Sequence, residues 1–277
     1  MTAGWVAGAV RARAMARRVL GADVARQLAA CQSLPEAQRM LETTPLRSAA
    51  EPGLSLAAAQ HAVADTILWD LRVLAGWLPR NGVSLLRLLA GWFEIANVDE
   101  LLHGLAGRPM GAEFQLGALA TAWPRMSEAG SPAEVRHVLA ASAWGDPGGD
   151  TSLAIRAGLR ARWVARLTGS GEPIRTWASA AAAVAALATP GRPRQGRPSR
   201  PQSTLAALPA AEPWQAEADW WRRVEREGHV LLRSSVTDSG PVLGAVAVMA
   251  ADARRVRAAL ASAARGGLAL EAYDAVV

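Results

Sequence analysis

Residues 83–107 read VSLLRLLAGWFEIANVDELLHGLAG and carry a clear hydrophobic rhythm. Apolar side chains recur there at steps of three and four and define a broad face: Leu85, Leu88, Leu89, Trp92 and Ile95. Such spacing is typical of an amphipathic α-helix, because about 3.6 residues complete one turn. The segment from Gly104 to Pro109 contains the residues that usually end a helix. The stretch therefore predicts one long helix with a broad buried face.

Similar spacing, together with helix start and stop signals, continues on both sides of this stretch. The signals include a proline in the first turn at 33–36, a Ser-x-x-Glu capping box at 131–134 and a Pro-Arg-Asn-Gly turn at 79–82. We predict further helices over 5–30, 33–43, 54–78, 131–142, 151–168, 172–189, 213–227 and 241–265, then a short terminal one. A strand-like pattern at 229–232 is weak. The sequence therefore predicts an all-α fold in a single domain over residues 1–277.

The predicted helix at 5–30 has two basic residues within its apolar stripe. Val6, Val10, Leu20, Val24 and Leu28 keep a three-and-four spacing only if Arg13 and Arg17 are counted with them. A buried guanidinium without partners costs several kcal/mol. The two arginines must therefore pair with carboxylates, face a polar interior or partner, or extend along the surface so that only their stems are covered. The sequence leaves these alternatives open.

Composition and charge restrict the class of protein. The chain has 277 residues, of which 51% are hydrophobic, so it can bury a proper core. Its net charge is +6, and every basic residue is an arginine. A basic balance suits nucleic acid, an anionic membrane surface or an acidic partner protein, although an ordinary solvated surface that uses arginine in place of lysine gives the same count.

Several features favour a cytoplasmic protein without a membrane span. Cys31 is the only cysteine, so no disulfide can form within the chain. Arginines arrive too early after the first residue for a signal peptide. The longest apolar run, at 178–188, is far shorter than the roughly twenty residues that cross a bilayer. We expect any link to a membrane to be peripheral.

Residues 190–204 form a segment rich in proline and arginine. Four prolines lie between 190 and 201, and they prevent a regular helix or strand. The composition predicts a flexible basic linker or an exposed loop. A basic arm that binds nucleic acid is the alternative, but no aromatic residue is interleaved with the arginines, as single-strand binding would favour.

The sequence offers no motif for catalysis, cofactor binding or metal binding. A Walker A loop needs a lysine, and the chain has none. Its four histidines lie far apart and show no ligand spacing with one another or with Cys31. The adjacent carboxylates Asp99 and Glu100 would point to different faces of a helix, which is poor geometry for acid–base chemistry. We therefore expect a protein that is not an enzyme and carries no cofactor.

Three stretches together resemble a known family. The first stretch is Trp5–Leu20, which contains an Arg-x-Arg pattern and is followed by a Leu-x-x-Thr segment at 41–46. The second is Leu85–Gly107, with Phe93, Glu94, Ile95 and Asn97 at the matching positions. The third is Gly240–Tyr273, in which the matching residues are Gly240-Pro241, Asp252, Val256-Arg257, Gly267-Leu268 and Glu271. Their order and spacing resemble those of the C-type subunits of bacterial and archaeal V/A-type ATPases, the counterparts of the d-type subunits of vacuolar ATPases. The resemblance extends over the whole chain.

This resemblance implies a fold and a role. The family fold is a funnel of three similar helical units around a pseudo-threefold axis, and the helices at 83–107, 172–189 and 241–265 would be its inner elements. The implied role is that of a non-catalytic rotor component of the central stalk. It would link the central-shaft subunits (D/F type) to the membrane proteolipid ring and transmit torque for proton or sodium transport. It would then lie in the cytoplasm, peripheral to the membrane.

The chain departs from the family pattern at three places. Leu46 replaces the usual aromatic residue of the first unit. In the middle unit, the Ala180–Ala186 run replaces an Asp-x-x-Asn pattern followed by arginine. The chain is also somewhat short, and the segment at 190–203 replaces part of the third unit. These departures bear on how regular the threefold arrangement is.

The interaction candidates are polar residues on otherwise apolar stripes. We predict that they line the funnel or set its geometry: Arg13, Arg17, Asn97, Asp252 and Arg257. Ion pairing within the chain, which would hold the three units together, is the alternative role for these residues. The alternative function is a helical nucleic-acid-binding or regulatory protein that uses the basic, arginine-rich surface.

Overall fold

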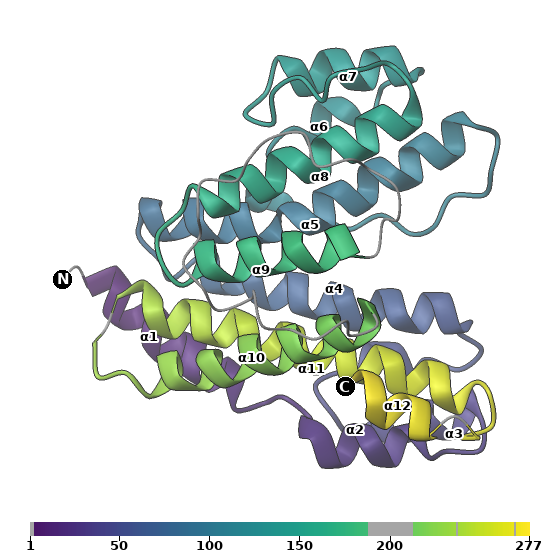
Figure 1. Cartoon of the computed structure of the whole chain (residues 1–277). Coiled ribbons are helices and arrows are strands. Elements are labelled where there is room, and N and C mark those ends of the chain that lie inside the picture. The colour runs from purple at the N-terminus through teal and green to yellow at the C-terminus, as the bar shows by residue number, and fades with distance from the viewer. Residues whose placement is uncertain (1–2, 188–212, 237, 269) are drawn as a thin grey trace.

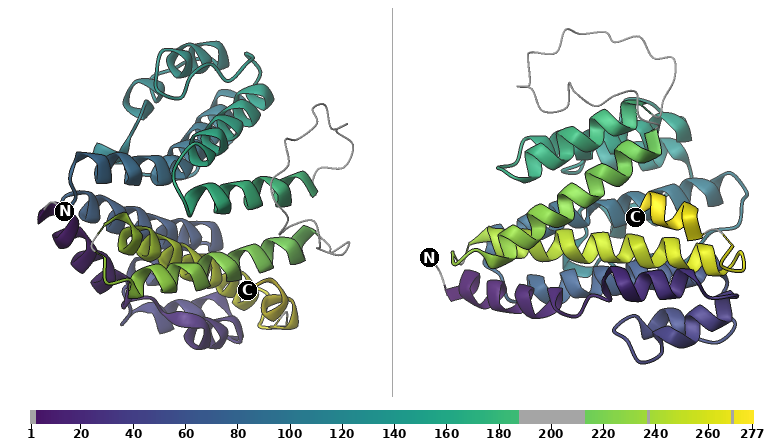
Figure 2. Two further views of the ribbon diagram at one scale, coloured as in Figure 1. Left: turned by 60° about the vertical axis from the view of Figure 1, so that its left-hand side comes forward. Right: turned by 60° about the horizontal axis from the view of Figure 1, so that its bottom comes forward.

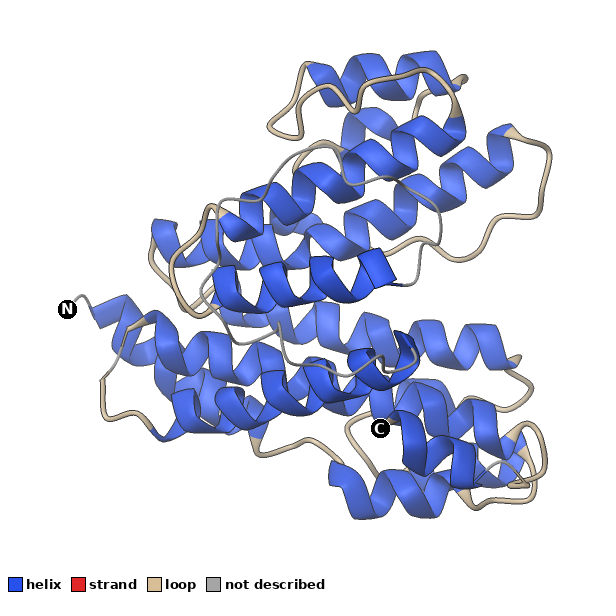
Figure 3. Ribbon diagram, in the orientation of Figure 1, coloured by secondary structure: helices blue, strands red, loops and turns tan. Residues whose placement is uncertain are grey.

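The computed structural model describes residues 3–187, 213–236, 238–268 and 270–277. Within these ranges every regular element is a helix, as Figure 3 shows. The predicted all-α class is confirmed. The proline- and arginine-rich segment predicted to be flexible at 190–204 lies outside the described residues.

The described residues form the following helices in chain order. The first half contains α1 (Ala3–Ala16), α2 (Gly21–Ala29), α3 (Leu34–Leu41), the 3₁₀ turn η1 (Arg47–Ala50), α4 (Leu56–Ala75) and α5 (Arg80–Leu105). The second half contains η2 (Gly117–Leu119), α6 (Trp123–Met126), α7 (Pro132–Ala140), α8 (Ser152–Thr168), α9 (Ile174–Leu187), α10 (Pro213–Arg233), α11 (Ser239–Ala263) and α12 (Leu270–Val276).

The single helix predicted at 5–30 is wrong, because the chain breaks into α1 and α2. Gly21 has φ +80°, a left-handed conformation that glycine adopts without strain. The Asp252 carboxylate accepts hydrogen bonds from the backbone N–H groups of Leu20 and Gly21 at 3.0 and 2.8 Å, which fixes the start of α2. The break therefore depends on a residue from the far end of the chain.

The predicted apolar stripe of this segment is also partly wrong. Val6 and Val10 are 44% and 62% exposed, respectively. The buried face of α1 is made instead of small residues and one methionine: Gly8, Ala9, Ala12 and Met15. A Cβ atom at Gly8 would lie 2.3 Å from a methyl carbon of Leu78, so this face packs closely against the end of the α4 segment.

The remaining helices agree with the prediction to within a few residues, with one further exception. The helix predicted at 213–227 continues to Arg233, so the strand-like pattern at 229–232 is helical. Hydrophobic periodicity of two over four residues is too short to compete with a helix that packs extensively against α11.

Consecutive helices pack in pairs, α4 with α5, α8 with α9, and α10 with α11. Figure 1 shows α5, α8 and α9 above α4, with α1, α10 and α11 below it, and Figure 2 shows α10 beside α11 from two other sides. α11 is buried along most of its length and contacts α1, α2, α4 and α10. Two apolar clusters make up most of the core, and α4 and α11 contribute to both.

A short structural unit occurs twice. In each copy a serine caps a helix, a glutamate three residues later accepts from the backbone N–H before the serine, and a hydroxyl residue after the helix closes a second turn. The spacing between matching residues is constant through both segments: Gln32, Ser33, Glu36, Leu41, Thr44 and Leu46 in the first, and Gly130, Ser131, Glu134, Leu139, Ser142 and Trp144 in the second.

Candidate interaction site

The most completely satisfied buried charge is Glu94, on the inner side of α5. Its side chain is 0% exposed. One carboxylate oxygen accepts from the N–H of Thr121 at 2.7 Å. The other accepts from the N–H groups of Ala122 and Trp123 at 2.6 and 2.9 Å, and from the indole N–H of Trp144 at 3.1 Å. Glu94 thus fastens the start of α6 and the end of the second repeated unit to α5.

Asp252 on α11 is a second buried carboxylate that binds backbone N–H groups. It is 4% exposed, and it binds the N–H groups that begin α2, just before the first repeated unit. Burial raises the pKa of this carboxyl group, while the two backbone hydrogen bonds and Arg255 oppose the rise. The positive end of the α2 dipole also favours a carboxylate here. α5 and α11 therefore each present a buried acid to the start of the short helix that precedes a repeated unit.

The pair formed by α9 and α10 is held in another way. No acidic residue occurs between Ile174 and Leu187. The indole N–H of Trp220 instead donates to the carbonyl of Trp177 at 3.0 Å, and the indole N–H of Trp177 donates to Glu227. Arg223 pairs with the same glutamate at 2.7 Å. Indole groups from both helices and one partly exposed ion pair thus hold this junction, where the other two use a buried carboxylate bound to backbone N–H groups.

Asn97, one turn from Glu94 on α5, holds the loop that follows this helix. It is 1% exposed, and its amide makes paired hydrogen bonds of 2.9 and 2.8 Å with the carbonyl and N–H of Phe114. The Phe114 ring stacks on His61 of α4 with ring centroids 4.1 Å apart. Burial lowers the pKa of His61, and nearby Arg257 adds to this effect. Asn97 therefore links α5 to α4 through an aromatic contact.

The three arginine candidates differ in their surroundings. Arg13 donates from Nε to the Leu232 carbonyl at 3.0 Å and from Nη2 to the Ser234 carbonyl at 2.6 Å, so it caps the end of α10. Arg17 follows α1 and is exposed. Arg257 on α11 makes no side-chain ion pair with any described residue, and desolvation lowers the pKa of its guanidinium.

The five predicted residues thus do not line one groove together, although Asn97 (through Phe114) and Arg257 both lie near His61. Arg13, Asn97 and Asp252 each hold a chain segment that is distant in sequence, whereas Arg17 and Arg257 present guanidinium groups at the surface. Sequence reasoning did not select Glu94 as a site residue. Glu94 lies on the same face of α5 as the buried residues Ile95 and Val98, and an acidic residue on an apolar face is a signal that the sequence does contain.

In the described part of the chain, no group of three or more His, Cys, Asp or Glu side chains is arranged to hold a metal ion. None of the described helices is long and apolar enough to cross a membrane. Comparisons of the chain with protein-family models and with curated proteins found no match.

Proposed function

We propose that this chain is a non-catalytic rotor component of a V/A-type ATPase. It would link the central shaft to the membrane proteolipid ring and transmit torque for coupled ion transport. In this proposal the pairs α4–α5, α8–α9 and α10–α11 are three similar units that form a funnel, with α5, α9 and α11 on the inner side. The resemblance of the three sequence stretches to the C-type subunits of these machines motivates the assignment.

The observation that carries the proposal is the pair of buried carboxylates. Glu94 and Asp252 lie on two of the three supposed inner helices, and each binds the backbone at the start of a short helix. Both short helices are followed by the same capping and turn hydrogen bonds. A repeat of this kind is expected of units related by rotation about a common axis. The acid is missing from α9, at the same unit in which the sequence departs from the family.

Close packing of helices supports a mechanical role. A rotor adaptor breaks no bond; it needs a body that does not shear under torque. Gly228 on α10 faces Gly244 on α11 so closely that a Cβ atom on Gly244 would lie 2.5 Å from the Gly228 carbonyl oxygen. Backbones in such contact leave little room for sliding. The buried carboxylates Glu94 and Asp252 would make α6 turn together with α5, and α2 together with α11.

Co-expression with the central-shaft (D/F type) and proteolipid subunits of a V/A-type ATPase from the same organism tests the proposal. We expect the full chain to co-purify with both in stoichiometric amounts. Alanine at Arg13 or Arg257 should reduce recovery of the complex several-fold while helix content stays the same. Arg265→Ala is the matched control, because this arginine is exposed and forms no ion pair with a described residue. Failure of the unmodified chain to bind either partner would refute the rotor role.

A helical nucleic-acid-binding or regulatory protein is the second candidate, favoured by the net charge of +6. Contacts to phosphates release counterions, so affinity for DNA would fall steeply as salt increases. Binding of a labelled DNA duplex with a steep salt slope would favour this function. Binding to ATPase subunits alone would exclude it.

A further inference from the structure

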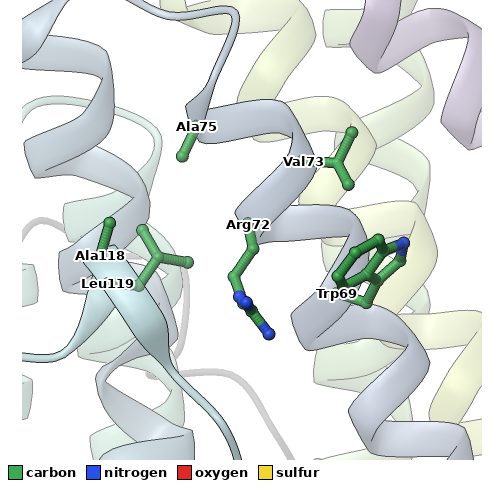
Figure 4. Close-up of a pocket in the computed structure, with 6 residues that line it drawn as sticks. All are labelled: Trp69, Arg72, Val73, Ala75, Ala118 and Leu119. Carbon is green, nitrogen blue, oxygen red and sulfur yellow. The ribbon is translucent and has the colours of Figure 1, made fainter.

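A shallow groove runs between α4 and η2, and neither Glu94 nor Asp252 is among the residues that line it. Its free volume is about 270 Å³, and its lining is mostly apolar: Trp69, Arg72, Val73, Ala75, Ala118 and Leu119. Figure 4 shows Trp69 and Val73 on the same side of α4 and Ala118 and Leu119 across from Arg72. The indole of Trp69 is 55% exposed, and Trp77, two turns further along, is 51% exposed.

Two arginines reach η2 from different helices. The Arg72 guanidinium lies 5.3 Å from the centre of the Trp69 ring, and a Cβ atom on Gly117 would come within 3.1 Å of its Nε. Arg87 of α5 donates from Nη2 to the Ala118 carbonyl at 3.0 Å, whereas its Nε is buried without a hydrogen-bond partner among the described residues. The Arg72 guanidinium therefore lines the groove, whereas that of Arg87 is held against the backbone of η2.

The charge at this groove is not balanced by the described chain. None of the residues that line it is acidic, and neither Arg72 nor Arg87 forms an ion pair with a described carboxylate. A guanidinium held over an indole can still bind a carboxylate through two parallel hydrogen bonds. Tryptophan and arginine are also the residues most enriched at the energetic centres of protein interfaces.

We propose that this groove is a docking site for an acidic, amphipathic helical segment of a partner protein. One apolar side chain of the segment would enter the groove beside Trp69, and a flanking carboxylate would pair with Arg72, the basic residue of the lining. The volume lies below the range of about 300–1,000 Å³ that is usual for small-molecule sites, so a single anchoring side chain fits it better than a free ligand. This inference goes beyond the rotor role and does not depend on it.

Fluorescence anisotropy of labelled peptides tests the site on the full chain. The probes are an amphipathic peptide of Glu and Leu in helical order, and a matched peptide with Gln in place of every Glu. We expect the acidic peptide to bind at least about tenfold more tightly than the Gln peptide, and the difference to shrink as salt increases. Arg72→Ala and Trp69→Ala should each weaken binding of the acidic peptide about tenfold, whereas exposed Arg108→Ala should leave it unchanged.

A photo-reactive residue in place of Ala118 gives a second measurement in cells. The expected product is a cross-link to an acidic, helical segment of one partner, lost when Arg72→Glu is added. Equal affinity for both peptides, binding that survives Arg72→Ala, or cross-links only to a second copy of this chain would overturn the proposal. Circular dichroism of each variant distinguishes loss of the site from loss of the fold. Because co-purification with shaft and ring is a separate assay, the rotor proposal can fail while this one holds.

Discussion

Glu94 is an acid whose partners are almost entirely backbone. Four N–H donors lie within hydrogen-bond distance of its two oxygens, and no described basic side chain pairs with it. A carboxylate is the side chain suited to this task, since it accepts up to four hydrogen bonds and donates none. An amide of the same shape can reproduce only part of the arrangement, because its NH₂ group would face N–H donors.

Glu94→Gln should therefore lower the free energy of unfolding by about 2 kcal/mol, as buried donors lose their acceptor. Urea denaturation followed by circular dichroism measures the change. Glu128→Gln is the control, since Glu128 is exposed near the same loop and makes no described hydrogen bond; its effect should stay within about 0.5 kcal/mol. Equal stability of the two variants would show that the clasp contributes nothing.

His61 makes stability depend on pH. Burial lowers its pKa, with Arg257 acting in the same direction and Asp65 and Glu100 opposing it. The unfolded chain then binds more protons than the folded one between the folded pKa and the ordinary value of about 6.5. The contribution of neutral His61 is thus fully present above about 6.5 and is lost as the pH falls through that value toward the folded pKa.

We expect His61→Gln to reduce the loss of stability on acidification. Unfolding free energies at pH about 7.5 and about 5.5 should differ less in this variant than in the unmodified protein. His137→Gln, at an exposed position on α7, should leave the pH dependence as it is. An unchanged pH dependence in His61→Gln would mean that other groups cause the loss.

At the scale of helices, what the sequence predicts depends on how local the determining contacts are. The sequence predicts the start of α7 correctly because Ser131 and Glu134 cap it from within four residues. It does not predict the break between α1 and α2, because Asp252 supplies the cap from more than two hundred residues away. Asn97 and Asp252 stand out in the sequence as polar residues on apolar stripes. Glu94 also lies on the buried face of its helix, but the sequence does not show which backbone N–H groups it binds, because these come from a loop almost thirty residues further on.

The contact between α10 and α11 gives an element-scale prediction. Gly244→Ala would place a methyl group against the Gly228 carbonyl, so the helices must move apart. We expect a loss of about 1–3 kcal/mol in the free energy of unfolding, typical of overpacking. Gly169→Ala serves as the control, because its Cβ would meet backbone oxygens only at ordinary distances of 3.4 and 3.6 Å. Thermal unfolding of both variants measures the difference, and similar midpoints would contradict the close approach.

At the scale of the molecule, the junctions between helices are held by different kinds of contact. Buried carboxylates clasp α5 to α6 and α11 to α2, where low polarity strengthens each hydrogen bond. α9 and α10 meet instead through Trp177, Trp220 and a partly exposed glutamate. Water competes more effectively for such contacts. If the protein acts as a rotor, the contact between α9 and α10 would be the first to open under torque.

Amide hydrogen exchange of a Trp177→Leu variant tests this inequality. The substitution removes the indole donor to Glu227 and shrinks a side chain that is 9% exposed and packs against Val224 and Ala247. Exchange should accelerate at least about tenfold in α9 and in the part of α10 that faces it, because local opening there costs less. α2, α6 and α7 should keep their protection, since their clasps are intact. Trp214→Leu, at an exposed position on α10, should change neither region. Equal acceleration in α6 and α9 would show that the molecule opens as one unit. The hydrogen bonds of Glu94 and Asp252 would then give the helices they hold no extra protection from exchange.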